Sequence, residues 1–463
     1  MKLADMKIHK LGRGYHLNEF KEYTNKKPVE TLPLPDEVVI PLLQHLGEAC
    51  DPVVNVGDKV KPGQLIGSLE EYWMAPVHSS VAGKVTAIEP RMTDSGQEVN
   101  SVVIEVDKEN SEFKLPARPH DPHEMDVEEL KDAIRHGGGV GMGGGACPTY
   151  ININLDEPVE TLILNGAECE PFLTCDQRQM VEWADELIGG AEILMRVIGA
   201  KKTYIGIETN KEDAIELLAT KVENRHDIEV VALEAKYPQG YKKNIIKSVT
   251  GRTPPEGARS SEVGCIVKNV GTAITTYNAV VYGKGCFERV VTVSGPGTVP
   301  KPGNYLVKVG TPIGHILTHC GVDLDSLDGH KVIMGGPMTG AAQKSFDVPI
   351  IKKTTGVLVL PPEFVESGEI SPCIRCGKCS EHCPIYLNPG ALSVFVEAGD
   401  FESAANWRLD QCAECGICSY VCPSRRPVTQ MILRAKPEVK KIVRARRKAQ
   451  KEREAAAKQK AAS

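Results

Sequence analysis

Residues 373–384 read CIRCGKCSEHCP and residues 412–423 read CAECGICSYVCP, so the same arrangement of four cysteines and a proline occurs twice. Three thiols at three-residue spacing let one turn of backbone wrap three sulfurs around an inorganic cube, and the fourth thiol, before the proline, points away. In paired motifs that fourth cysteine binds the cluster of the other motif. The spacing therefore predicts two [4Fe-4S] clusters, one bound by Cys373, Cys376, Cys379 and Cys422, the other by Cys412, Cys415, Cys418 and Cys383.

Zinc ribbons and disulfides are the alternatives for these cysteines. Zinc sites place two CxxC pairs apart and stop at four ligands, which does not match two runs of CxxCxxC, each followed by a Cys-Pro. Cysteines three residues apart are poorly placed to bridge one another, and the opening MKLADMKIHKLGRGYH lacks the apolar segment of a secretory signal. We therefore expect iron-sulfur clusters in a reducing, low-oxygen compartment.

Length and composition bound the other possibilities. The 463 residues allow three or four domains, and the net charge of -6 gives no indication of nucleic-acid binding. No apolar run approaches the length of a membrane span, so any membrane association is expected to be peripheral. The cysteines outside the two motifs are expected to be small buried hydrophobic residues, with a third metal site as the alternative; they are Cys50, Cys147, Cys169, Cys175, Cys265, Cys286 and Cys320.

Residues 1–114 are rich in short β-branched runs separated by Gly and Pro. Within them, GDKVKPGQLIG followed by APVHSSVAGKV resembles a lipoyl or biotinyl carrier domain, a barrel-sandwich hybrid. In such carriers the hairpin between the two halves holds the modified lysine. Here that hairpin is EEYWM, residues 70–74, and contains no lysine, so a structural module is expected rather than a swinging arm.

The remainder of the chain predicts a multidomain α/β and α+β protein. A polar linker at 115–126 leads to residues 127–287, where strands alternate with long helices, the pattern of an α/β domain whose mainly parallel sheet binds ligands at the carboxyl ends of its strands. Residues 288–330 predict a small mixed fold, and residues 331–365 predict strands that return to the α/β sheet. Residues 366–433 form the mostly helical cluster domain.

The tail at 434–463 is strongly basic and rich in alanine. Its usual explanation is a solvated end that is partly helical or disordered. Contact with anionic lipid or with an acidic partner is the functional alternative, and nucleic acid comes third.

A glycine-rich loop, HGGGVGMGGGACPTY at 136–150, holds seven glycines between Gly137 and Gly145. Backbone N–H groups without side chains can approach a phosphate or a flat ring. A second loop, NGAECEPFLTCDQR at 165–178, places an amide and several carboxylates directly after a buried strand, at the expected ligand end of the sheet. Together these loops suit a flavin.

With these motifs in place, the chain resembles the C subunit of the Rnf (Rsx) complex, an ion-translocating membrane oxidoreductase that links ferredoxin to NAD. The resemblance runs from about Gly12 to Arg434 and is carried by LPLPDEVVIPLLQHLG, GMGG, CPT, LNGAECEPFLTCDQR, YPQGYKKNIIKSVTGR, VKNVGTA, VSGPGTVPKPGNYLVKVGTPI, MGGPMTG and the two cysteine motifs. The middle domain is similar to the flavin- and NADH-binding subunit of respiratory complex I, and residues 288–330 to its soluble-ligand-binding β-grasp domain.

The resemblance implies a peripheral subunit on the cytoplasmic face of the cell membrane that holds FMN, contacts NAD(H) and passes electrons through two [4Fe-4S] clusters. It implies integral-membrane and ferredoxin-type Rnf subunits, and ferredoxin, as partners. No catalytic acid or nucleophile is needed for outer-sphere electron transfer. The flavin-site residues that it implies are Gly143, Gly144, Pro148, Asn165, Glu168, Glu170 and Asn269.

Two departures from the family pattern concern the nicotinamide. Cys147 stands where the family usually has an aromatic residue, and Tyr241, Lys242 and Lys243 follow YPQG where the family usually has an acidic residue. A second hypothesis therefore keeps the complex and the clusters but replaces NAD by another partner, such as a cytochrome or a membrane electron carrier. A third hypothesis, from a different class, is a non-redox scaffold built on the N-terminal sandwich.

Overall fold

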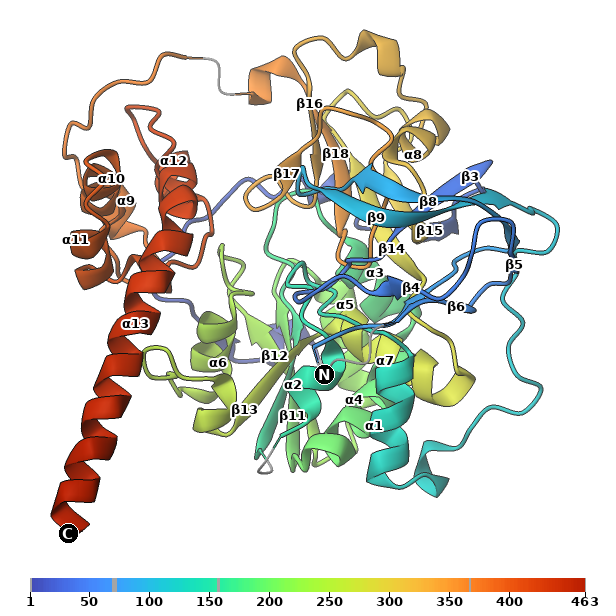
Figure 1. Cartoon of the computed structure of the whole chain (residues 1–463), viewed down its shortest axis with the longest axis horizontal. Helices are drawn as coiled ribbons and strands as arrows, with labels where there is room; N and C mark the ends of the chain where they lie inside the picture. Colours follow the sequence, from blue (N-terminus) through green and yellow to red (C-terminus); the bar gives the residue numbers. More distant parts are fainter. Residues whose placement is uncertain (1, 69–72, 156–158, 366–367, 463) are drawn as a thin grey trace.

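The computed structural model of the chain describes residues 2–68, 73–155, 159–365 and 368–462, with side chains described as far as residue 455. Figure 1 shows a central body of sheets and helices, with the C-terminal helical domain on one side of it. Most of the EEYWM hairpin at 70–74, which contains no lysine, lies outside the described residues.

A five-stranded parallel sheet forms the middle of the chain, in the order β1-β12-β11-β10-β13. Alternate residues of β10 point to opposite faces, because side chains alternate along a strand. Leu162 and Leu164 pack with α1, α4, α5 and α7, whereas Ile163 packs with α6. The strands are β1 (Ile8–His9), β10 (Thr161–Gly166), β11 (Lys202–Glu208), β12 (Ile228–Leu233) and β13 (Cys265–Asn269).

Helices pack on both faces of this sheet. Residues 175–198 form two helices, because the backbone leaves the helical conformation at Trp183. The helices of this domain are α1 (Val127–His136), α2 (Thr149–Ile153), α3 (Cys175–Glu182), α4 (Ala184–Ile198), α5 (Glu212–Lys221), α6 (Lys242–Thr250) and α7 (Val270–Tyr282).

A second, mixed sheet has the order β17-β16-β18-β14-β15-β2. The prediction that residues 331–365 return to the parallel sheet is wrong. β18 pairs in parallel with β14, and β16 pairs with β18, so the buried GVLVL segment of β18 joins the sheet of the 288–330 module instead. The elements are β2 (Val29–Thr31), β14 (Glu288–Ser294), β15 (Gly303–Lys308), β16 (Lys331–Met334), β17 (Ala341–Ala342), β18 (Gly356–Leu360) and helix α8 (Ile313–His319).

The N-terminal module consists of two small antiparallel sheets packed on a shared core that contains Val38, Ile40, Ile66, Val77 and Ile104. Its expected start at residue 1 is wrong, because β1 and β2 pair with strands of the two other domains. One sheet contains β3 (Glu37–Pro41), β9 (Glu98–Val106), β8 (Gly83–Met92) and β5 (Lys59–Val60), and the other β4 (Asp51–Pro52), β6 (Leu65–Ser68) and β7 (Val77–His78).

The cysteine-rich domain repeats its backbone as well as its sequence. Residues in the left-handed region occur at matching positions of the two motifs, in the pairs Arg375 and Glu414, Gly377 and Gly416, and Tyr386 and Arg425. A short helix follows in each motif, and then a longer one begins after the Cys-Pro. The helices are α9 (Lys378–Glu381), α10 (Pro389–Glu397), α11 (Phe401–Asn406), α12 (Ile417–Tyr420) and α13 (Val428–Ala462).

The expected boundary between this domain and a basic tail at residue 434 falls inside α13. Ala435 and Val439 are buried in the core of the domain with Leu392 and Ile432, so the first turns of the tail belong to the domain. No helix in the described part of the chain is long and apolar enough to cross a membrane.

Candidate functional site

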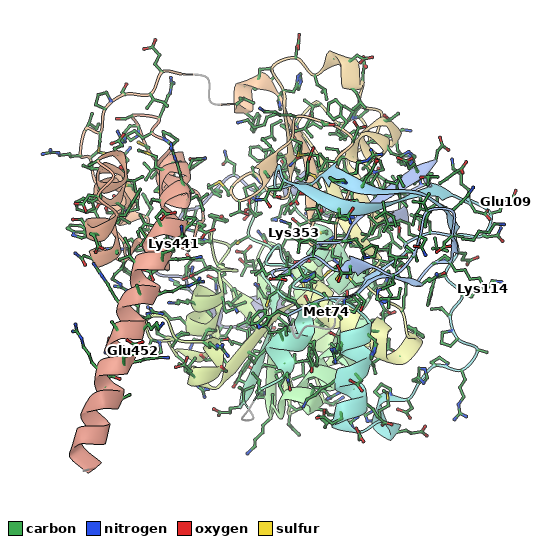
Figure 2. All side chains as sticks on the ribbon, viewed as in Figure 1. Met74, Glu109, Lys114, Lys353, Lys441 and Glu452 are labelled. Carbon is green, nitrogen blue, oxygen red and sulfur yellow. The ribbon has the colours of Figure 1, made fainter. Side chains whose placement is uncertain are left out.

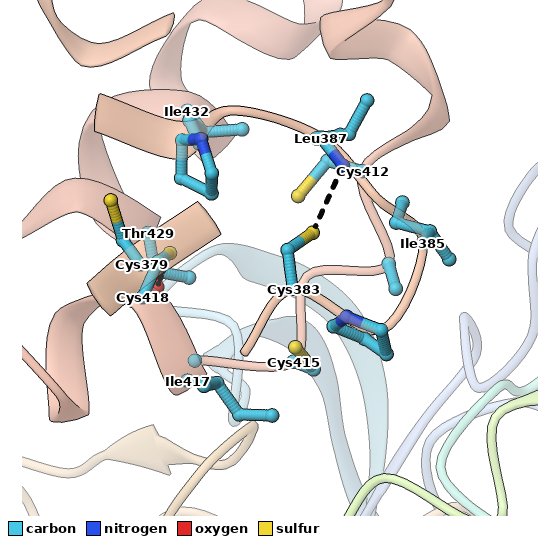
Figure 3. Close-up of a pocket in the computed structure, with 14 residues that line it drawn as sticks. Cys379, Cys383, Ile385, Leu387, Cys412, Cys415, Ile417, Cys418, Thr429 and Ile432 are labelled. Atoms are coloured by element: carbon cyan, nitrogen blue, oxygen red, sulfur yellow. Dashed lines mark hydrogen bonds between the residues drawn. The ribbon is translucent and has the colours of Figure 1, made fainter. Parts of the chain in front are cut away.

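Five thiols line a small cavity in the cysteine-rich domain: Cys379, Cys383, Cys412, Cys415 and Cys418. The rest of the wall is largely apolar and includes Ile385, Leu387, Ile417 and Ile432 (Figure 3). The structure thus brings Cys383 of the first motif together with three cysteines of the second. Such a wall excludes water while it presents soft sulfur ligands, as an iron-sulfur cluster requires.

Polar groups surround the sulfurs of this cavity. The Leu387 N–H donates to Cys383 Sγ at 3.3 Å, and the Glu414 N–H donates to Cys412 Sγ at 3.4 Å. The Thr429 hydroxyl lies 3.2 Å from Cys418 Sγ. Burial raises the pKa of Cys415 to about 12, so the free thiol keeps its proton at neutral pH. A bound metal would take the place of that proton.

The remaining cysteines of the two motifs lie nearer to solvent. Cys373 and Cys376 are exposed and Cys422 is half-buried, whereas Cys379 is half-buried and is one of the five thiols that line the small cavity. The predicted set of Cys383, Cys412, Cys415 and Cys418 thus contains two buried and two half-buried thiols, whereas the other set contains two exposed and two half-buried thiols.

A much larger cavity, of about 930 Å³, opens at the carboxyl ends of the parallel strands. Six of the seven predicted flavin-site residues line it: Gly143, Gly144, Asn165, Glu168, Glu170 and Asn269. The seventh, Pro148, is buried at the start of α2 and is not part of the wall. The position agrees with the rule that open α/β sheets bind ligands beyond the carboxyl ends of their strands.

The glycine-rich loop presents bare backbone to this cavity. Gly144 has φ +89°, and a Cβ atom at Gly144 or Gly145 would meet nothing within 4 Å. The loop is held at its base, where the Met142 N–H donates to the Thr272 hydroxyl at 3.0 Å and the Lys352 ammonium donates to the Gly138 carbonyl at 2.7 Å. The backbone next to the open space can therefore approach a ligand closely.

Both predicted carboxylates on the second loop are already engaged by the protein. Glu168 accepts from the backbone N–H groups of Asp176, at 2.7 Å, and Gln177, at 3.2 Å, at the start of α3. Glu170 accepts from the Met338 N–H at 2.9 Å, and burial raises the pKa of this carboxyl. These two residues thus position the loop that lines the cavity.

Lys21 holds the same loop, and no sequence signal had singled it out. Its buried ammonium donates to the carbonyl oxygens of Glu168, Glu170 and Leu173, at 2.8, 3.0 and 2.5 Å. Burial lowers the pKa of Lys21. The lysine precedes the N-terminal module in sequence, so only the folded chain brings it to this loop.

The two predicted amides, Asn165 and Asn269, lie at the carboxyl ends of the neighbouring strands β10 and β13. Asn165 donates to the Gly240 carbonyl at 2.9 Å, and Asn269 donates to Asp176 Oδ2 at 2.6 Å. The other carboxyl oxygen of Asp176, Oδ1, is buried and has no hydrogen-bond partner in the described part of the chain. Burial, together with the charge of Glu168, raises the pKa of Asp176 to about 7. A buried, orphaned carboxyl oxygen at a cavity wall suits a ligand that supplies its partner.

Lys268 is a second residue that the sequence analysis missed, although it precedes Asn269 in the VKNVGTA motif. It lines the cavity, and its buried ammonium donates to the Thr149 carbonyl at 3.3 Å. Burial lowers its pKa to about 7, with the charge of Lys242 acting in the same direction. Cys147 and Lys242, which mark the two departures from the family pattern, line this cavity as well.

The alternative of a third metal site among the other cysteines can be located. Cys147, Cys169 and Cys175 all line the large cavity. Apart from the cysteines of the two motifs, a potential metal-binding group in the described residues combines Cys175 with Glu168 and Asp176, whose ligand atoms lie within 4.8 Å of one another. Because the Glu168 carboxylate already accepts from the start of α3, this group has a structural explanation.

The two cavities share part of their walls. Ala413, Cys415 and Thr429 line both, so the thiol set of the small cavity borders, through Cys415, the cavity that holds the predicted flavin residues. Glu414, Gln430 and Leu433 extend this wall on the side of the cysteine-rich domain.

Comparison with known proteins gives three matching family descriptions. Residues 9–109 match the RnfC barrel sandwich hybrid domain, residues 134–278 the Nuo51 FMN-binding domain, and residues 369–425 a 4Fe-4S dicluster domain. The C subunit of the proton-translocating ferredoxin:NAD(+) oxidoreductase complex of Clostridium ljungdahlii is 39% identical over 393 residues, which cover 84% of this chain and 85% of that protein. The chain belongs to the RnfC family.

A second relative in the RnfC family is the C subunit of the Na(+)-translocating ferredoxin:NAD(+) oxidoreductase complex of Acetobacterium woodii, 38% identical over 81% of this chain and 85% of that protein. Among solved structures, a chain of the NAD+-reducing [NiFe]-hydrogenase in its H2-reduced state is similar at 18% identity and a TM-score of 0.46. The match covers 68% of this chain and 62% of the hydrogenase chain. The predictions of the family, of the fold class and of FMN and iron-sulfur cofactors are confirmed.

The residues of this RnfC protein fit both cofactors. The small cavity offers thiol sulfurs in an apolar wall, which suits a cluster. The large cavity offers open glycine backbone, the orphaned Asp176 oxygen and the Lys268 ammonium, which suit a polar, phosphate-bearing flavin.

Proposed function

We propose that this chain transfers electrons between a flavin and nicotinamide site and two iron-sulfur clusters in an Rnf-type complex. The observation that carries the proposal is that Cys415 lines both the small thiol cavity and the large cavity. The bound flavin supplies the exchange between two-electron and one-electron carriers. The protein's contribution is to fix distances, to exclude water and to set the polarity around each cofactor.

The inner cluster is assigned to Cys383, Cys412, Cys415 and Cys418, because all four line the small cavity and match one predicted ligand set. The outer cluster is assigned to Cys373, Cys376, Cys379 and Cys422, of which Cys373 and Cys376 are exposed and Cys379 lies beside the inner set in the small cavity. Since the inner set borders the large cavity, it is the one next to the flavin, and the outer set faces partner proteins.

For the flavin, the open backbone of Gly143, Gly144 and Gly145 serves as a cradle, with Asn165 and Asn269 at the sheet edge. Glu168 and Glu170 hold the loop rather than the ligand, because their carboxylates are bound to backbone groups. Lys268 supplies positive charge inside the cavity, and Asp176 Oδ1 supplies one unpaired polar atom. Pro148 fixes the turn that begins α2.

Relatives of this chain are named as subunits of ferredoxin:NAD(+) oxidoreductase complexes. NAD(H) is therefore the first proposal for the molecule that exchanges electrons with the flavin in the large cavity. A specific observation favours an alternative. Cys147 and Lys242 both line the cavity, so the departures from the family pattern change its ring-stacking surface and its electric field. In the alternative, the clusters exchange electrons with a cytochrome or a membrane electron carrier and the nicotinamide site is unused.

The partners are the other subunits of the Rnf complex. Within that set, we assign integral-membrane and ferredoxin-type subunits, with ferredoxin as the soluble redox partner. The chain then sits peripherally on the cytoplasmic face of the cell membrane. The absence of a candidate membrane span from the described helices is compatible with this assignment.

The test is the visible spectrum of the anaerobically purified protein, recorded before and after NADH and then after dithionite. Bleaching of flavin and cluster absorbance by NADH is expected. Bleaching of the clusters by dithionite but not by NADH would support the presence of redox-active clusters and would favour the alternative without NAD. A colourless, iron-free protein would overturn the electron-transfer function and support a scaffold.

A further inference from the structure

Helix α13 has two parts with different surroundings. Its first turns are buried in the cysteine-rich domain through Val428, Ile432, Ala435 and Val439. From Arg444 to Ala455, every described side chain is exposed. Figure 1 shows this second part as the end of a long helix that runs out beyond the other helices of its domain.

The flank of α13 that faces the protein is occupied. Ile442 and Val443 pack against the domain core. Arg446 donates to the Asn406 side-chain oxygen at 2.9 Å and also pairs with Glu402. Arg447 lies against Gly257 of the α/β domain. These contacts fix the rotation of the helix about its own axis.

The remaining flank carries what we call the basic stripe, formed by Lys440, Arg444, Lys448 and Lys451. Their spacing of four, four and three residues places all four on one face of the helix. All are exposed, and none of them pairs with a carboxylate among the described side chains. In Figure 2, Glu452 marks this second part of the helix, beyond the other helices of the domain.

The chemistry of the stripe selects among anionic partners. Specific protein interfaces bury aromatic or large aliphatic side chains at their centre, but from Arg444 to Ala455 alanine is the only apolar residue type. Three of the four charges are lysines, which act as point charges on flexible stems rather than as planar, bidentate groups. Four cations on one helix face match a surface of many loosely ordered anions, and nucleic acid is disfavoured by the net charge of -6 over the whole chain.

We propose that the basic stripe docks α13 on an anionic lipid surface and gives this protein a direct electrostatic contact with the membrane. The contact goes beyond the electron-transfer function and does not require it. It adds to attachment through the other parts of the complex.

The experiment is co-sedimentation of the full-length, cluster-loaded protein with vesicles of phosphatidylcholine, with and without about one-third phosphatidylglycerol. The test variant carries Lys440→Gln, Arg444→Gln, Lys448→Gln and Lys451→Gln, because glutamine keeps helix propensity while it removes charge. The matched control carries the same change at four exposed lysines of the N-terminal module and the segment after it: Lys59, Lys61, Lys84 and Lys114.

Binding is expected only to the anionic vesicles and is expected to weaken with added salt. The stripe variant should bind at least about tenfold more weakly, and the control variant should bind like the parent protein. Circular dichroism and iron content should be unchanged in both variants. The proposal is overturned if the parent protein does not bind anionic vesicles or binds neutral vesicles equally well. It is also overturned if the stripe variant binds anionic vesicles as tightly as the parent protein does. Spectral bleaching by NADH, tested separately, reports on the electron-transfer function alone.

Discussion

Tyr15 and Tyr237 exchange two backbone hydrogen bonds: the Tyr15 N–H donates to the Tyr237 carbonyl at 2.8 Å and the Tyr237 N–H donates to the Tyr15 carbonyl at 3.0 Å. Tyr237 lines the large cavity. The Tyr15 ring meets His382 and Tyr420 edge-on, at centroid distances of 5.0 and 5.5 Å. The segment around Tyr15 is therefore a physical link between the flavin-side loop and the cysteine-rich domain.

Replacement of Tyr15 by alanine should loosen this link. Because electron transfer slows steeply as carriers separate, we expect the clusters to be reduced at least about tenfold more slowly, while NADH reduces the flavin at its usual rate. Stopped-flow absorbance separates the two phases. Hydrogen exchange of the cluster-loaded protein should rise at residues 235–241 and 378–386.

Two variants serve as controls for this prediction. Tyr15→Phe keeps the ring edges and should behave like the parent protein. Phe113→Ala removes a comparable ring contact, with Phe287 at 5.3 Å, between two residues that are not part of the cavity wall. Equal slowing of both phases in Tyr15→Ala, or unchanged cluster reduction, would count against the positioning role.

Lys21→Met should destabilise the protein and empty its flavin site. The substitution leaves the carbonyl oxygens of Glu168, Glu170 and Leu173 without their buried donor. An unsatisfied buried carbonyl costs about 1–3 kcal/mol, so a loss of roughly 2–5 kcal/mol is expected after partial relaxation. Anaerobic urea unfolding measures the stability, and flavin absorbance per protein measures the site. Full flavin content in the variant would show that the loop holds its shape without Lys21.

Lys268 should make flavin retention depend on pH. Burial lowers its pKa to about 7, so the side chain is cationic below this pH and neutral above it. A charge-assisted hydrogen bond to an anionic ligand contributes about 1.5–3 kcal/mol, so retention should weaken roughly tenfold or more as pH rises through 7. Flavin fluorescence released on dilution reports this directly.

The matched variants for Lys268 divide charge from shape. Lys268→Met should retain flavin weakly at every pH, and Lys268→Arg should retain it with little dependence on pH, because arginine stays protonated. A pH step that survives in Lys268→Met would assign the titration to another group.

Some residues of this site can be predicted from local sequence patterns, whereas others are brought to it only by contacts between distant parts of the chain. Cysteine spacing is local, so the motifs define the candidate ligands. The rule for parallel sheets places the loop that begins at Asn165 at the ligand end of the sheet, whereas Asn269 came only from the family resemblance. Lys21 and Tyr15 act across long sequence separations, and no local pattern marks them. The strands at 331–334 and 356–360 have the right periodicity, but periodicity does not tell which sheet a strand joins. Likewise, charge composition alone placed the tail boundary at 434, inside a helix whose buried face only packing reveals.

Cys376→Ala and Cys415→Ala should separate the two assigned clusters. Each variant loses one ligand of one set, so each should lose about half of the iron. Because Cys415 lines both cavities, Cys415→Ala should stop electrons at the flavin, which NADH would still bleach. Cys376→Ala should leave the inner cluster reducible by NADH but should block delivery to an external acceptor, since Cys376 is exposed. Iron analysis and low-temperature EPR after NADH distinguish these states. If NADH reduced the remaining cluster in Cys415→Ala and failed to do so in Cys376→Ala, the order of the two clusters would be reversed.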